Sequence, residues 1–323
     1  MADFTTVSKT EEGTRLLRWF LRHYPAMPQR EFYRLCRGGQ IRVNSKRVRG
    51  QEILRAGDAV RVPPTVAGYA TEKPKRSEGG DAFSLSDLEM LRKCIVHNDD
   101  DIVVFNKPAG LAVQGGTGIR KSVDKMAAAL FPYDKISLVH RLDRETSGLL
   151  VVAKNHRAAQ SLAGQFQTKN AHKEYLALLC GDVSPKYGTI DNYMIKGQVF
   201  ETDTRLNNGT GPRPQRAITE YKVLSNAAGC VSWVNFSPKT GRTHQLRLHS
   251  ALTLGAPIVG DALYGGNRKI NDSLAAVLKT NNLFLFAYKL TFQHPSTGRM
   301  ITLRANIPDF MLPVIKFLEL KMP

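Results

Sequence analysis

The first part of the chain shows apolar residues at the spacing of short amphipathic helices, followed by short alternating segments. Residues 14–23 predict one helix, which Thr14 can cap with its hydroxyl. Residues 29–37 predict a second helix, which ends at the pair Gly38-Gly39. Short strands joined by turns are predicted at 40–43, 46–48 and 56–62. Together these elements predict a compact module over residues 10–65.

The pattern changes after residue 65. Residues 66–85 contain Pro74 and the pair Gly79-Gly80 and lack apolar periodicity, so we interpret them as a linker. From residue 86 to 323, helix and strand signals alternate, which predicts one large α+β domain. The polar stretch 201–215 predicts an exposed loop that could touch a substrate. A length of 323 residues agrees with one small and one large domain.

The longest apolar runs are short. Residues 149–153 and 283–287 fall far below the roughly 18 residues that a membrane-spanning helix needs. No apolar segment follows a basic one near residue 1. We therefore expect a cytoplasmic protein with no membrane partner. Four widely separated cysteines predict reduced thiols rather than a zinc site or a disulfide framework: Cys36, Cys94, Cys180 and Cys230.

Charge is the most informative feature of the composition. Lys and Arg total 46 against 28 Asp and Glu, which gives a formal net charge of +18. The segment 30–49 alone contains seven basic residues and a single acidic one, Glu31. Such clustering favours a nucleic acid as the partner over a merely solvated surface.

Two short motifs in the basic module resemble the S4 RNA-binding domain. They are Gly-Gln-Ile-Arg-Val-Asn at 39–44 and Gly-Asp-Ala-Val-Arg-Val at 57–62. The resemblance implies that five basic residues contact RNA phosphates, the alternative being ordinary surface charge. These residues are Arg15, Arg34, Arg37, Lys46 and Arg47.

A glycine-rich turn at 115–118, followed by Lys121-Ser122, approaches the phosphate-loop pattern G-x4-G-K-S. Arg120 stands where that pattern needs a glycine, and its side chain would crowd the backbone amides that wrap a phosphate. We therefore expect no nucleotide cofactor.

Polar residues are concentrated at 140–148, directly before the apolar strand predicted at 149–153. Arg141 and Arg144 flank Asp143, and a nearby cation keeps a partly desolvated carboxylate ionised. Such a carboxylate is a candidate nucleophile or base. The alternative is that Asp143 and Glu145 only satisfy local arginines and turns.

A third polar segment occupies 241–249. His244 and His249 are five residues apart, which is unsuitable for two metal ligands on one helical face, so we expect no metal. No Gly-x-Ser-x-Gly elbow supplies a nucleophile that His140 or His244 could activate. Both histidines are therefore expected to be structural or to contact substrate.

Three motifs together resemble the RluA family of RNA pseudouridine synthases, in particular the RluC-like branch that acts on large-subunit ribosomal RNA. They are Asn-Lys-Pro-Ala-Gly at 106–110, His-Arg-Leu-Asp-Arg-Glu-Thr-Ser-Gly at 140–148 and Gly-Arg-Thr-His-Gln-Leu-Arg at 241–247. The resemblance implies an α+β fold in which a catalytic domain with a mostly antiparallel mixed sheet follows an S4-type domain. Gln114 departs from the family pattern, where a histidine is expected, which leaves the choice of substrate open.

The resemblance also assigns residues to the reaction. It implies that uridine is isomerised to pseudouridine in 23S ribosomal RNA without a cofactor, on a nucleotide flipped out of the helix. Asp143, Tyr175 and Arg247 are the expected catalytic residues, with Arg247 pairing with Asp143. Five residues are expected to contact the substrate, and Arg141 is expected to fill the gap left by the flipped base: His140, Arg141, Asn106, Arg242 and His244.

Several alternatives stay open at this point. Asp143 acts either by adding to uracil or the sugar, or by removing a ribose proton. The RNA is expected to be a large-subunit precursor, although free RNA is an alternative, and the enzyme is expected to be a monomer. The rival hypotheses are a non-catalytic RNA-binding assembly factor and, more distantly, a phosphate-loop nucleotide hydrolase.

Overall fold

The computed structural model describes residues 3–24, 26–69, 83–116, 118–195, 197–201, 213–227, 229–265 and 281–321. The chain forms two compact units, one of residues 1–82 with 131–135 and one of 83–130 with 136–323. Residues 202–212 of the expected substrate loop and 70–82 of the expected linker lie outside the described residues.

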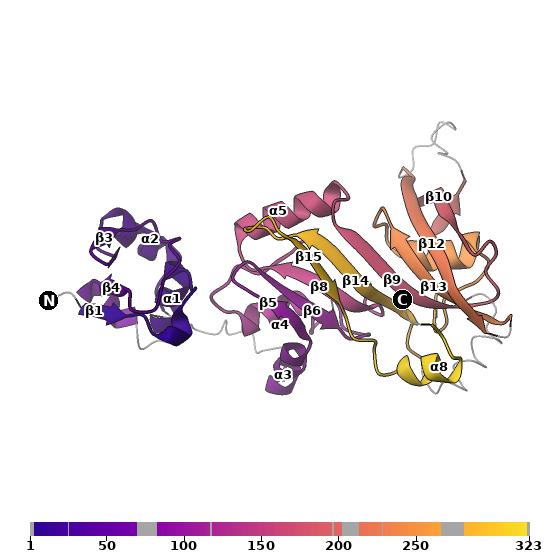
Figure 1. Cartoon of the computed structure of the whole chain (residues 1–323), viewed down its shortest axis with the longest axis horizontal. Coiled ribbons are helices and arrows are strands. Elements are labelled where there is room, and N and C mark those ends of the chain that lie inside the picture. Colours follow the sequence, from indigo (N-terminus) through magenta and orange to yellow (C-terminus); the bar gives the residue numbers. More distant parts are fainter. Residues whose placement is uncertain are drawn as a thin grey trace. The chain divides into compact units, whose positions relative to one another are not determined.

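The smaller unit is a four-stranded antiparallel sheet with two helices (Figure 1). The strand order is β1-β4-β2-β3, from β1 (Asp3–Thr6), β2 (Arg42–Val43), β3 (Lys46–Arg47) and β4 (Ala59–Val62). Helices α1 (Leu16–His23) and α2 (Gln29–Arg37) contribute the fully buried Trp19, Phe20 and Phe32 to its core. Asn44 and Ser45, both at positive φ, form the tight turn between β2 and β3.

Two details of this unit differ from the sequence-based expectations. The predicted cap is wrong: α1 has Arg15 at its N-cap without a side-chain capping bond, and the carbonyl of the buried Thr14 accepts the Leu54 N–H over 2.9 Å. Residues 66–69, expected in the linker, belong to a 3-10 helix (Pro64–Tyr69) whose Val66 is fully buried. An apolar side chain held in the core in this way extends the unit past residue 65.

The larger unit contains an eleven-stranded sheet (Figure 1). Its main strand order is β11-β10-β12-β13-β9-β14-β8-β6-β5, and β15 and β7 pair with β14 and β8. The strands are β5 (Ile95–Asn98), β6 (Ile102–Lys107), β7 (Ser137–Leu138), β8 (Ser147–Ala153), β9 (His172–Cys180), β10 (Tyr187–Ile195), β11 (Gln198–Phe200), β12 (Gln215–Ala227), β13 (Val231–Pro238), β14 (Leu285–Gln293) and β15 (Met300–Arg304). The β8–β14 pair is parallel and the other pairs between these strands are antiparallel, which confirms a mostly antiparallel mixed sheet.

Helices pack around this sheet. Those in the described residues are α3 (Leu85–Lys93), α4 (Val123–Leu130), α5 (His156–Gln167), α6 (Gln245–Leu248), a π-helical turn η4 (His249–Thr253) and α8 (Leu312–Phe317). Helix α5 contacts β8 and β14, and every residue of β8 is buried, as expected for its apolar run. In the described part of the chain, no helix is long and apolar enough to cross a membrane.

Gly148 sets the path of the chain into β8. It has φ +110° and lies opposite Ala287 of β14, and a Cβ at this position would lie 2.3 Å from the Ala287 carbonyl oxygen. Only glycine permits so close a backbone approach. This approach places the preceding loop, 139–146, at the end of β8, where the candidate site lies.

Candidate active site

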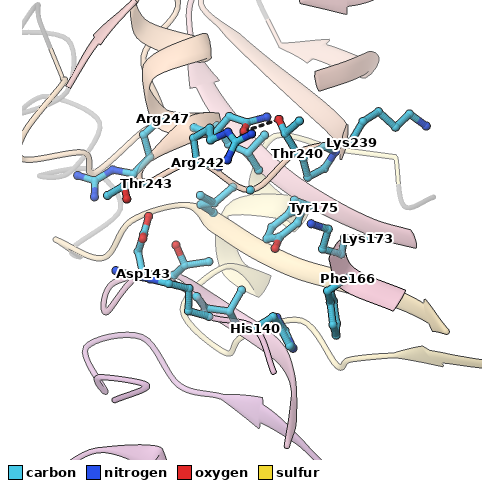
Figure 2. A pocket seen from close by; sticks show the side chains of 18 of the residues that line it. His140, Asp143, Phe166, Lys173, Tyr175, Lys239, Thr240, Arg242, Thr243 and Arg247 are labelled. Carbon is cyan, nitrogen blue, oxygen red and sulfur yellow. Dashed lines mark hydrogen bonds between the residues drawn. The ribbon is translucent and has the colours of Figure 1, made fainter. Parts of the chain in front are cut away.

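A cavity of about 400 Å³ lies between the loop 139–146 and the segment 238–247 (Figure 2). The end of α5, the first half of β9 and Leu285 of β14 complete its wall. Six of the residues expected from the sequence line this cavity: His140, Arg141, Asp143, Tyr175, Arg242 and Arg247. Segments far apart in sequence are therefore brought together here.

Asp143 is half-buried in the cavity wall. Its backbone is held by the turn in which its carbonyl accepts the Thr146 N–H over 3.1 Å. Among the described residues its carboxylate has no hydrogen-bond or ion-pair partner. In Figure 2 this carboxylate points to the side of the cavity from which Thr243 and Arg247 extend. The acidic group is thus available to a molecule in the cavity.

Lys107 supports the loop from behind. Its fully buried ammonium donates to the carbonyl oxygens of Pro108, Leu111 and Arg144 over 2.8–2.9 Å. Burial lowers the pKa of Lys107 to about 7, opposed by the negative charges of Glu145 and Asp143. These bonds fix the turn after β6 to the loop that carries Asp143. Sequence reasoning missed this role, although the lysine lies within a motif that had been recognised.

Asn106 is not brought into the cavity. Its amide donates to the Asn306 carbonyl over 3.0 Å, and the described residues that line the cavity do not include it. Successive side chains of a strand point to opposite faces, so Asn106 and Lys107 of β6 cannot both face the loop. The structure therefore does not bring Asn106 to the site at which a substrate contact was expected.

Tyr175 of β9 presents its ring to the cavity. Burial, together with the negative charge of Asp143, raises the pKa of Tyr175. The phenol is therefore protonated at neutral pH and can stack on a base or donate a hydrogen bond.

His140 forms a rigid, neutral part of the wall. Its Nε2 accepts the Val151 N–H over 3.0 Å, and its ring stacks on Phe166 with centroids 4.4 Å apart. Burial, with a contribution from the charge of Lys173, lowers the pKa of His140 to about 3. The accepting role of Nε2 places the ring proton on Nδ1, which is the atom left to contact a ligand.

Arg247 is paired with a residue other than the one expected. Its Nε and Nη2 donate to Asp261 over 2.7 and 2.6 Å, whereas the sequence-based expectation paired it with Asp143. Burial opposes ionisation, but hydrogen bonding to Asp261 and the negative charges of Asp261 and Asp143 raise the pKa of Arg247. A guanidinium has two edges that donate hydrogen bonds, so one edge serves Asp261 while the cation still acts on Asp143 through space.

Tyr264 extends this cluster. The Arg247 guanidinium lies 5.1 Å from the centre of the Tyr264 ring. The backbone N–H of Tyr264 donates to Asp261 Oδ1 over 3.0 Å. The Tyr264 hydroxyl hydrogen-bonds His244 Nδ1 over 2.9 Å. His244, at φ +55°, precedes α6 and is directed to Tyr264, and the described cavity lining does not include it. Of the residues expected to contact substrate, His244 is therefore a neighbour of the cavity.

The arginines at the rim are exposed. Arg242 donates to the Arg216 carbonyl over 3.1 Å and to Gln215 Oε1 over 2.8 Å. Arg141 lines the cavity with its side chain open to solvent. Both can reach a polyanion outside the cavity.

One group of described residues has the spacing of metal ligands: Asp99, Asp101 and His294. Asp99 Oδ1 accepts the N–H groups of Asp101 and Ile102, and Asp99 Oδ2 lies 3.1 Å from His294 Nε2. Asn155 donates to Asp101 over 2.8 Å. The group is satisfied by protein hydrogen bonds, so we assign it no metal.

The family follows from comparison with known proteins. The RNA pseudouridylate synthase family model matches residues 101–252. The chain is 34% identical to ribosomal large subunit pseudouridine synthase C of Vibrio cholerae, over 94% of this chain and 93% of the relative. It is 35% identical to the protein of the same name from Escherichia coli K12, over 94% and 92% of the two chains. The chain belongs to the RNA pseudouridine synthase family.

The fold of the synthase agrees with this family assignment. The structure of human RNA pseudouridylate synthase domain containing 4 is similar with a TM-score of 0.57 and 28% identity, over 73% of this chain and 97% of that one. The family and enzyme class predicted from the sequence are thereby confirmed.

Sequence reasoning missed Asp261 of the synthase. A signal was present, because Asp261 is the single charged residue in the apolar and glycine-rich run 255–261. A buried carboxylate of this kind needs a partner, and Arg247 is that partner.

The basic residues of the smaller unit differ in their availability. Arg37, Lys46 and Arg47 are exposed. Arg34 is exposed but paired with Glu31, and Arg15 is half-buried at the start of α1.

Proposed function

We propose that this synthase converts specific uridines to pseudouridine in large-subunit ribosomal RNA, with Asp143 as the reacting carboxylate. The observation that carries the proposal is the Asp143 carboxylate, which has no partner among the described residues and lines a cavity of about 400 Å³ together with Tyr175 and Arg247. The names of the relatives from Vibrio cholerae and Escherichia coli support the choice of RNA.

The reaction defines what the site must do. The bond from uracil N1 to ribose C1′ breaks, a bond from C5 to C1′ forms, and a proton leaves C5 while N1 gains one. The balance involves no net oxidation. Asp143 acts as a nucleophile toward the uracil or the sugar, or as a base toward the ribose. Tyr175, being neutral, stacks on the uracil, and Arg247 stabilises the negative charge of Asp143.

A uridine within folded RNA reaches this cavity only when it leaves the base stack. Unstacking costs a few kcal/mol, which phosphate contacts offset. Arg141, exposed at the rim, is the side chain we propose to fill the space that the base leaves.

The test is to sequence pseudouridine in ribosomal RNA from cells with and without this protein. The proposal expects at least one large-subunit uridine to remain unmodified without it and to be converted again when the protein is returned. Identical pseudouridine maps in the two strains would contradict the proposal. Treating free RNA and subunit precursors with the purified protein shows which of them is the substrate.

We further propose that residues 10–65 act as an S4-type RNA-binding module. The exposed cations around the β2–β3 turn support this, since phosphate contacts supply most of the affinity for RNA. Replacing Lys46 and Arg47 with Ala should lower RNA affinity and its salt dependence and leave the rate at saturating RNA unchanged. Replacing Arg92 and Lys93 of α3 removes the same charge and serves as the control. Equal losses of RNA affinity in the two double variants would contradict the proposal that residues 10–65 bind RNA.

The proposal includes a monomeric enzyme in the cytoplasm. No disulfide joins Cys36, Cys94, Cys180 and Cys230, as suits a reducing compartment. Light scattering of the purified protein and fractionation of cells test these two points.

A further inference from the structure

Lys173 is a lysine that the reaction described above does not use. It lies on β9 two residues before Tyr175, so both side chains point to the same face of the strand, about 7 Å apart along it. Both line the cavity that holds Asp143. Its Nζ lies 3.9 Å from the position that a Cβ on Gly241 would take, so the ammonium faces the loop across the cavity.

The ammonium of Lys173 differs from the two fully buried lysines. Lys107 donates to three carbonyl oxygens, and Lys154 donates to Asn98 Oδ1 and the Asp99 carbonyl, both over 2.7 Å. Lys173 has neither a hydrogen-bond acceptor nor an ion-pair partner among the described residues. Burial lowers the pKa of Lys173, and no carboxylate in the described part of the chain opposes that shift. A partly buried cation without a partner destabilises the fold, so its presence indicates a ligand.

A second, smaller cavity begins at Lys173. It has a volume of about 210 Å³ and shares Phe166, Lys173, Pro238 and Lys239 with the first. Lys169 and His172 also line it. The lining therefore carries more positive than negative groups.

The single acidic residue among the described lining residues of this second cavity, Glu174, is already paired. Its carboxylate binds Lys289 over 2.7 Å and accepts from Asn235 over 3.1 Å. Lys239 is paired with Glu220 over 2.7 Å, which leaves Lys173 as the cation at the junction of the two cavities. The geometry suits an anion attached to the molecule that occupies the first cavity.

We propose that Lys173 binds a backbone phosphate of the flipped uridine. The proposal rests on the function proposed above, because it places the uracil beside Asp143 and Tyr175. The phosphate then lies about 7 Å further along β9, toward the second cavity. An ammonium and a phosphate form a charge-assisted hydrogen bond, which suits a point charge with three donors.

The test pairs a variant with a chemically altered RNA. Once sequencing has located a target uridine, short RNA substrates are made with one uncharged methylphosphonate, placed 5′ of that uridine, 3′ of it, or four nucleotides away. The wild-type enzyme should lose about tenfold in kcat/KM with one of the two adjacent substitutions and little with the distant one. The Lys173→Met enzyme, already weakened about tenfold on unmodified RNA, should lose nothing further at that position.

Three further measurements make the outcome decisive. Lys173→Arg should retain part of the activity because it keeps a cation. Lys93→Met removes an exposed lysine that lines neither cavity, and it should behave as wild type at every position. Free Lys173→Met enzyme should unfold at the same or a higher temperature, because an unpaired charge has been removed, whereas a purely structural lysine would lower that temperature.

Two results would overturn the assignment. Additive losses in Lys173→Met at both adjacent positions mean that the ammonium contacts neither phosphate. A loss in kcat alone, with the methylphosphonate effect intact, means that it acts on the base. Failure of the wild-type enzyme to convert any mapped uridine would instead contradict the proposed function itself.

Discussion

Arg247 and Asp261 form a buried, bidentate ion pair, in which Nε and Nη2 donate over 2.7 and 2.6 Å. Asp261 Oδ1 also accepts the N–H groups of Leu263 and Tyr264, so the carboxylate is fixed by the backbone of its own turn. A bidentate pair fixes the plane of the guanidinium as well as its position. Asp261 therefore determines where the remaining edge of Arg247 points relative to Asp143.

This relationship predicts how Arg247 variants fail. Arg247→Met should lower the single-turnover rate roughly tenfold to hundredfold, while RNA affinity changes less, because the cation acts on Asp143 rather than on a phosphate. Arg247→Lys should recover part of the rate as a point charge but lose the bidentate geometry. Asp261→Asn should resemble Arg247→Lys in rate. Equal losses of rate and binding in the Met variant would indicate a phosphate contact instead.

The sequence predicted the arrangement of this site only in part. The motifs located Asp143, Tyr175 and Arg247, and the structure brings all three to one cavity. Asp261, the partner of Arg247, was missed because it lies 14 positions later in the chain, beyond the end of α6. Helix and strand periodicity does not link two residues at that separation. The sequence did not indicate that Asn106 lies outside this cavity, because a motif gives residue types, while the direction of each side chain depends on strand register.

The fold, like the site, was predicted where local sequence signals suffice and missed where long-range contacts decide. Helix α2 was predicted with its observed bounds, because its apolar spacing and the glycines that end it are local signals. Strand β1 was not predicted, since its four residues are held only by pairing with β4, more than fifty positions later. The sheet order likewise depends on contacts that local patterns do not encode.

Gly148 provides a test of how the loop is positioned. Gly148→Ala should destabilise the protein by more than 2 kcal/mol, on the order expected for strain at positive φ combined with a backbone clash. Gly164→Ala is the matched control, because it lies within α5 with nothing within 4 Å and should stabilise by about 0.5–1 kcal/mol. Thermal unfolding of the two variants measures both effects. A neutral Gly148→Ala would show that β14 does not constrain this loop.

A buried histidine predicts a dependence of stability on pH. His249 is held by Thr219 and Asn192, and burial lowers its pKa to about 4, whereas in the unfolded chain it is near 6.5. The unfolded state therefore binds a proton first as the pH falls, so the stability present above pH 6.5 is progressively lost toward pH 4.

Between pH 6.5 and 5, the difference in slope between the wild type and a His249 variant isolates this effect, because His140, whose pKa burial also lowers, contributes a slope of its own to both proteins. The wild type should lose about 2 kcal/mol from this histidine by pH 5. His249→Asn, although less stable throughout, should show a shallower slope. His172→Asn, which changes an exposed histidine of β9, should keep the wild-type slope. Parallel slopes for all three proteins would contradict the assignment.

The decisive variant of the reaction is Asp143→Asn. Asn has nearly the same shape but cannot carry the negative charge that nucleophilic attack or proton removal requires, so product formation should be abolished. Because the carboxylate has no partner among the described residues, its loss should leave the unfolding temperature almost unchanged. RNA affinity should hold or increase slightly, since one negative charge near the RNA is removed.

Release of tritium from uracil labelled at C5 measures the reaction directly, because the new carbon–carbon bond forms at that atom. Asp143→Glu should also be inactive, as the longer side chain displaces the carboxylate from the reacting atoms. Glu145→Gln makes the same change of charge two residues away, on an exposed side chain, and should release tritium at close to the wild-type rate. Appreciable release by Asp143→Asn would mean that another group in the cavity performs the chemistry.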